Sequence, residues 1–104
     1  MMTFEQFKVE VSAHLPNLKL NFEDQSTNED FCHVADVFVD NTYLEVVHQD
    51  VPKPWIAKMI IALYNGDADD LFGYGYTLSE CLGCLMAEVN RARSCYNDAM
   101  EMWT

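Results

Sequence analysis

The sequence predicts an α+β fold: an N-terminal helix, an antiparallel sheet of three to five strands, and a long C-terminal amphipathic helix packed on the sheet. Apolar residues recur at helical spacing near both ends of the chain, whereas the middle is rich in Val, Phe and Tyr, which favour strands. With 104 residues, 50 % of them hydrophobic, the chain can bury one core but is too short for a second. We therefore expect a single domain over residues 1–104.

The first helix is predicted over residues 3–14. Thr3 and Gln6 have the spacing of a capping box, in which each side chain bonds the other's backbone N–H. The pattern stops at Pro16. The apolar positions of this helix recur every three or four residues: Phe4, Phe7, Val11 and Leu15.

Strands follow the first helix. Apolar and polar residues alternate over 17–23, which predicts a half-buried strand, and residues 23–30 then form a predicted acidic turn. Residues 31–39 and 43–48 are rich in β-branched and aromatic side chains and are separated by a short polar turn. They are predicted to pair as a hairpin.

Residues 55–64 fit two structures. Pro54 and the Asn65-Gly66 pair suit the two ends of a helix, but the apolar residues between them fit a strand that is buried on both faces, and we favour the strand. A loop over 65–70 would then lead into a last strand over 71–76. Gly73 and Gly75 in that strand predict a bulge or the close approach of another element.

The C-terminal helix is predicted over residues 78–101. Thr77 and Glu80 form a second capping box. One apolar stripe follows at steps of three and four: Leu78, Leu82, Leu85, Val89, Ala92, Tyr96, Ala99 and Trp103.

The acidic residues are unevenly distributed. Seventeen Asp and Glu against six Lys and Arg give a formal charge of −11, which argues against direct binding to nucleic acid. Between residues 23 and 70 eleven acids face only Lys53 and Lys58, so this segment carries −9. Such a charge can simply keep a small protein in solution, or it can imitate a row of phosphates and attract a basic partner.

No run of 18 apolar residues and no signal-peptide pattern is present, so we expect a cytoplasmic protein that does not bind membranes. Cys81 and Cys84 form a C-x-x-C pair that could hold zinc or act in redox chemistry, and the helix N-terminus could lower the pKa of Cys81. A second ligand pair and the other residues of a redox motif are missing. We therefore expect packing cysteines, no metal, no cofactor and no catalytic residues.

Residues 54–89, a Trp-led strand and a Gly-containing strand leading into a capped helix, resemble small proteins of bacteriophages and prophages. The Thr77-Leu78 and Cys81-Leu82 positions are similar to the phage ABA-sandwich family. The G-x-T-x-x-E-x-L pattern that begins at Gly75 is similar to HicB-like antitoxins. Combined with the small size and the acidity, the resemblance implies a phage accessory protein of the anti-CRISPR or anti-restriction type.

These observations predict a non-enzymatic inhibitor that binds a basic, nucleic-acid-binding surface of a host defence complex. The alternatives are an antitoxin-like or assembly protein that binds through Tyr74, Tyr76 and Trp103, and an enzyme or metal protein built on Cys81 and Cys84; a homodimer is left open. The predicted contacts of the inhibitor are Glu23, Asp24, Glu29, Asp30, Asp36, Asp40, Asp67, Asp69 and Asp70.

Overall fold

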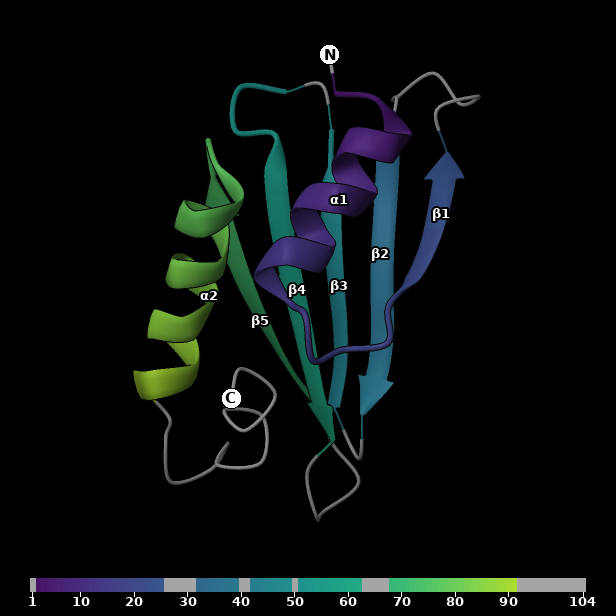
Figure 1. Cartoon of the computed structure of the whole chain (residues 1–104). Coiled ribbons are helices and arrows are strands. Elements are labelled where there is room, and N and C mark those ends of the chain that lie inside the picture. The colour runs from purple at the N-terminus through teal and green to yellow at the C-terminus, as the bar shows by residue number, and fades with distance from the viewer. Residues whose placement is uncertain (1, 26–31, 40–41, 50, 63–67, 92–104) are drawn as a thin grey trace.

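The computed structural model describes residues 2–25, 32–39, 42–49, 51–62 and 68–91, and it confirms the predicted α+β fold (Figure 1). Five strands form one antiparallel sheet in the order of the chain, β1-β2-β3-β4-β5. The elements are α1 (Phe4–His14), β1 (Asn21–Gln25), β2 (Cys32–Val39), β3 (Thr42–His48), β4 (Trp55–Ala62), β5 (Ala68–Gly75) and α2 (Leu78–Arg91).

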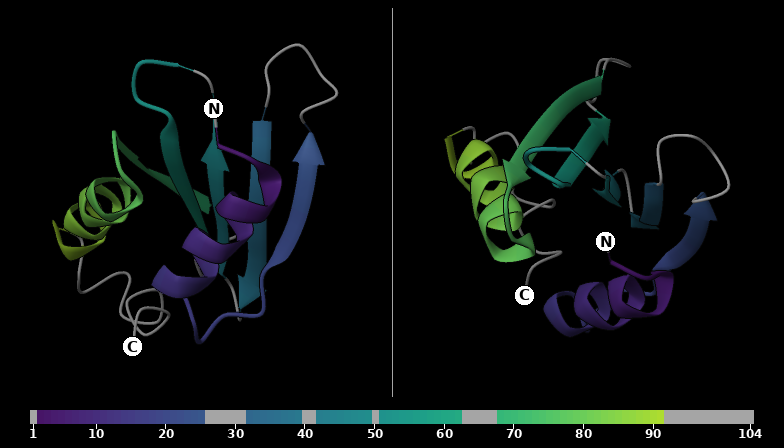
Figure 2. Two further views of the ribbon diagram at one scale, coloured as in Figure 1. Left: turned by 45° about the horizontal axis from the view of Figure 1, so that its top comes forward. Right: turned by 90° about the horizontal axis from the view of Figure 1, so that it is seen from above.

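Both helices lie on the same side of the curved sheet, as seen along the strands in Figure 2. The core fills the space between this side and the helices, and it includes Leu44, Met59 and Leu85, which are all fully buried. Neither helix in the described part of the chain has the length and apolar character that crossing a membrane would require.

The predicted start of α1 is confirmed. The Thr3 N–H donates to Gln6 Oε1 at 2.9 Å, and the Gln6 N–H donates to Thr3 Oγ1 at 3.1 Å. Both bonds satisfy backbone donors that would otherwise lack a partner at a helix N-terminus. Phe7 and Val11 are fully buried and join the helix to the sheet, where the Phe7 ring stacks on Trp55.

The second capping box also forms. The Glu80 N–H donates to Thr77 Oγ1 at 3.1 Å, while Glu80 Oε2 accepts the N–H groups of Tyr76 and Thr77 at 2.9 and 3.2 Å. The first half of the predicted stripe, from Leu78 to Val89, is buried. The predicted helical residues 92–101 lie outside the described residues.

Gly73 and Gly75 are in β5 because α2 packs directly on this strand. A Cβ atom at Gly75 would lie 2.6 Å from the backbone nitrogen of Cys81, and one at Gly73 would overlap the Cys81 carbonyl oxygen. Any side chain would push the helix away, which confirms the predicted close approach of another element.

Residues 55–62 form strand β4, which confirms the favoured strand for this part of the predicted range 55–64; residues 63 and 64 lie outside the described residues. Predicted boundaries of β1 and β5 were wrong. The first strand begins at Asn21, because the chain is still turning at Leu18, whose N–H donates to the Leu15 carbonyl at 3.3 Å. Strand β5 begins at Ala68, so Asp69 and Asp70 pair with Ile61 and Ile60 of β4 instead of lying in a loop.

Likewise, Glu23 and Asp24 belong to β1 and not to the predicted acidic turn, because they pair with Val34 and His33 of β2.

Candidate protein-binding surface

The side of the sheet away from the helices, called the open face below, is formed by alternate residues of every strand. The strand register places these residues side by side, because side chains in a strand point alternately to opposite sides. The open face includes Glu23, Val34, Asp36, Phe38, Tyr43, Glu45, Val47, Ile56, Lys58, Ile60, Asp70, Phe72 and Tyr74.

Large apolar side chains on the open face are accessible to solvent. Phe38, Phe72 and Tyr74 retain 69 %, 38 % and 49 % of their surface in the described structure. The Phe72 and Tyr74 rings stack with centroids 6.3 Å apart. Several exposed aromatic residues on one rigid sheet are a feature of surfaces that bind other proteins.

A row of charged residues crosses the middle of the open face. Asp36 lies opposite Glu45, Glu45 lies opposite Lys58, and Lys58 lies opposite Phe72. The Lys58 ammonium is 6.0 Å from the centroid of the Phe72 ring, within the range of a cation–π contact. Two carboxylates directly opposite each other repel, so the acidic end of this row favours a positively charged partner.

Tyr43 connects the two carboxylates. Its hydroxyl lies 3.2 Å from Asp36 Oδ2 and 3.1 Å from Glu45 Oε2, and its single proton can be donated to only one of them at a time. Burial, followed by the charges of Glu45 and Asp36, raises the pKa of Tyr43 far above its usual value. The hydroxyl therefore remains a donor, while the two carboxylates keep acceptor positions for further donors.

The predicted contact residues are divided between the two sides of the sheet. Glu23, Asp36 and Asp70 are on the open face, whereas Asp24 and Asp69 are on the helix side. Asp24 Oδ1 lies 3.3 Å from Nδ1 of the buried His33. Four further predicted contacts lie outside the described residues: Glu29, Asp30, Asp40 and Asp67.

The aromatic residues of the alternative hypothesis are divided as well. Tyr74 is on the open face, and Tyr76, which follows the end of β5, is 62 % exposed. Trp103 lies outside the described residues. Sequence reasoning did not select Tyr43, Glu45 or Phe72 as site residues, because their juxtaposition depends on the register of β2 to β5.

Cys81 has the surroundings of a packing residue. Cys81 is buried, its Sγ donates to the Gly73 carbonyl at 3.4 Å, and burial together with the neighbouring Cys84 raises its pKa to about 12. The lowering that the helix N-terminus could cause is not seen, because desolvation of the thiolate dominates. A buried packing role is confirmed for Cys81 and wrong for Cys84, which is exposed; Cys32 is half-buried, and Cys95 lies outside the described residues.

Within the described ranges, no group of three or more His, Cys, Asp or Glu side chains is placed to hold a metal ion. Comparisons of the chain with protein-family models, with curated proteins and with solved structures gave no match.

Proposed function

We propose that this protein is a non-enzymatic inhibitor that binds a basic, nucleic-acid-binding surface of a host defence complex through its open face. The observation that carries the proposal is the composition of that face: four carboxylates and one lysine lie among exposed aromatic side chains on a single sheet. Nucleic-acid-binding surfaces are rich in Arg and Lys, which pair with carboxylates and also pack on aromatic rings.

The acids and the aromatic residues have different tasks in this proposal. Exposed carboxylates steer a basic partner and speed association, while aromatic residues such as Phe72 and Tyr74 supply contact area once the partner has docked. The resemblance of residues 54–89 to phage-encoded proteins supports a host defence complex as the target. Nucleic acid would then be displaced because the open face occupies its site.

The proposal is tested by affinity capture from host cells with three versions of the protein. The first is the wild type, the second is Asp36→Asn with Asp70→Asn on the open face, and the third is Glu5→Gln with Glu88→Gln on the helices. The two variants lose the same charge. An exposed ion pair is worth about 0.2–1 kcal/mol, so the open-face variant should bind its partner roughly two- to thirtyfold more weakly, and the helix variant should bind normally.

The purified partner is then loaded with labelled nucleic acid, and its release by each version is measured at low and at high salt. The proposal requires release by the wild type, weaker release by the open-face variant, and a steep loss of association rate with salt. Equal binding by both charge variants would show that the open-face acids are not the contact.

The antitoxin-like or assembly function is the second candidate, and the exposure of Tyr74 and Tyr76 favours it. It predicts a complex that hardly responds to salt and is lost in Tyr74→Ala, with no nucleic acid released. The same capture experiment therefore separates the two functions.

A further inference from the structure

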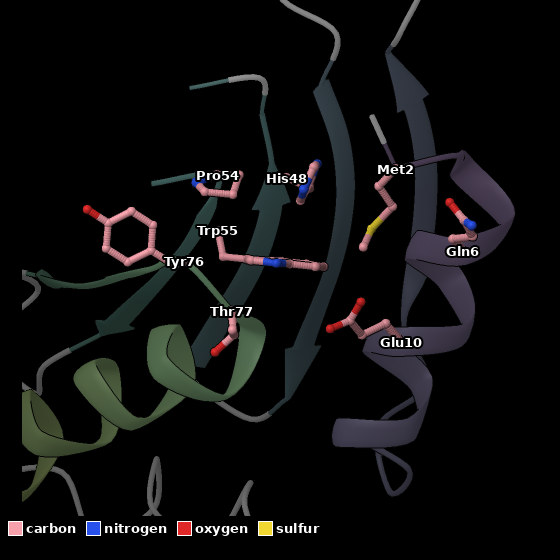
Figure 3. Close-up of a pocket in the computed structure, with 8 residues that line it drawn as sticks. All are labelled: Met2, Gln6, Glu10, His48, Pro54, Trp55, Tyr76 and Thr77. Atoms are coloured by element: carbon pink, nitrogen blue, oxygen red, sulfur yellow. The ribbon is translucent and has the colours of Figure 1, made fainter. Parts of the chain in front are cut away.

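A pocket of about 610 Å³ lies on the helix side of the sheet, between α1 and the residues that lead into α2 (Figure 3). Met2, Pro54 and Trp55 contribute apolar surface to it, and Glu10 and Thr77 contribute polar groups. The volume falls in the range of small-molecule and side-chain binding pockets. Because the pocket and the open face are on opposite sides of the sheet, the two sites are separate.

The floor of the pocket is held in place by stacked rings. Trp55 is 3 % exposed, and its indole packs against the Phe7 ring with centroids 5.7 Å apart and planes 13° apart. The imidazole of His48 meets the indole edge-on at 4.8 Å. A floor that is already ordered lowers the entropic cost of binding a ligand.

The charge of the lining selects the type of ligand. Glu10 is an acidic residue of the lining and directs its carboxylate toward Trp55 (Figure 3), and no Lys or Arg lines this pocket in the described part of the chain. A helix N-terminus would ordinarily attract an anion at the opposite wall. Here the carboxylate of Glu80 accepts the N–H groups of Tyr76 and Thr77, so this wall already carries a negative charge.

The ring of Tyr76 already has a cation of the protein itself beside it. The ammonium of Lys53 lies 5.6 Å from the centroid of the Tyr76 ring, and Tyr76 is itself part of the lining. An aromatic ring face attracts cations through its quadrupole. A ligand cation deeper in the pocket would have the Glu10 carboxylate as its counter-charge.

We propose that this pocket binds a guanidinium or ammonium group carried on an apolar stem, with the charge at Glu10 and the stem against Met2, above the largely buried Trp55. A lysine or arginine side chain of a partner protein and a free alkylamine share this chemistry. The pocket would thus give the protein a second binding site, independent of the open face.

The probe is n-butylguanidinium, added to 15N-labelled protein while the indole N–H signal of Trp55 is followed by NMR. A Trp103→Phe variant assigns the two indole signals. The Trp55 signal should shift with a dissociation constant of about 1 mM, as expected for a ligand of this size. Glu10→Gln should weaken binding by about tenfold, because a charge-assisted hydrogen bond is lost.

Glu5→Gln is the matched control, since Glu5 is also on α1 but pairs with Lys8 outside the pocket. It should bind the probe as the wild type does. The open-face variant Asp36→Asn with Asp70→Asn should also bind the probe normally, so this test does not depend on the proposed inhibitor function. Well-dispersed spectra confirm that each variant is folded.

Two probes with the same butyl stem, neutral 1-butanol and anionic pentanoate, test the need for a positive charge. The proposal is overturned if either shifts the Trp55 signal as strongly as n-butylguanidinium does, if Glu10→Gln binds normally, or if the cation causes no shift. A millimolar constant supports a partner side chain as the natural occupant, and a micromolar constant supports a free amine.

Discussion

The two sides of the sheet are made of the same strands and differ in almost every other respect. On the helix side Ala35, Leu44 and Met59 are fully buried. On the open face Asp36, Tyr43 and Lys58 alternate with them along β2, β3 and β4. One side is the core of the protein, and the other carries charged and aromatic groups that the core does not need.

The comparison shows why the middle of the chain is both acidic and apolar. A sheet covered by helices on one side needs apolar residues only at every second position, so the remaining positions can carry binding residues without loss of stability. Exposed aromatic residues such as Phe38, which is 69 % exposed, do little for folding. Substitutions on the two sides should therefore affect different measurements.

The largest effect is expected in the core. Leu85→Ala, at a fully buried position of α2, should lower the free energy of unfolding by about 2–5 kcal/mol, because it leaves a cavity against the sheet. Phe72→Ala on the open face should lower it by less than about 1 kcal/mol. Denaturant unfolding measures both, and equal losses would show that the two faces do not differ as described.

Glycine substitutions test the contact between α2 and β5. Gly73→Ala should destabilise the protein by about 1–3 kcal/mol, since the new methyl group would overlap the backbone of Cys81. Gly83→Ala adds the same methyl group within α2, where no atom lies within 4 Å, and should stabilise by about 0.5–1 kcal/mol through helix propensity. If Gly73→Ala were also stabilising, the close packing of α2 on β5 would be wrong.

The buried thiol makes stability depend on pH. Burial raises the pKa of Cys81 to about 12, so the folded protein keeps a proton that the unfolded chain releases near its ordinary value of about 9. The stability associated with this proton is fully present below about pH 9 and is lost as the pH rises toward 12. The loss should approach about 1.4 kcal/mol per pH unit between those values.

Unfolding curves at a series of alkaline pH values compare the wild type with Cys81→Ala, which should lose stability less steeply. Cys84→Ala should keep this slope over a slightly narrower pH range, because Cys84 is exposed and contributes less than burial to the raised pKa of Cys81. Identical slopes for the wild type and Cys81→Ala would contradict the burial of this thiol.

Features that depend on residues close together in the sequence were predicted correctly. Both helices begin where Thr3 and Thr77 predict, because a capping box is formed within four residues. The start of β5 could not be predicted in this way. Asp69 and Asp70 have little strand propensity and become strand residues only because β4 offers them partners at Ile61 and Ile60.

The candidate site was predicted only in part, because it also depends on the pairing of strands that are distant in the sequence. The acids of the middle segment are visible in the sequence, but β2, β3 and β4 carry apolar residues on both sides, so alternation alone does not show which side the helices cover. The row from Asp36 to Lys58 requires the register of three strands, which is set by pairing.

The smallest expected effect is the sharpest test of the difference between the two faces. Asp69 and Asp70 are neighbours with the same charge, but Asp70 is exposed on the open face and Asp69 is on the helix side, half-buried. Asp70→Asn should weaken binding of the captured partner by up to about fivefold, more at low salt than at high salt, as expected for one exposed charge pair. Asp69→Asn should leave that affinity unchanged while the formal charge changes equally. Surface plasmon resonance at two salt concentrations measures both variants. If they weakened binding to the same extent, the partner would be responding to net charge and not to the open face, and the acidic residues would act only as a general electrostatic attraction.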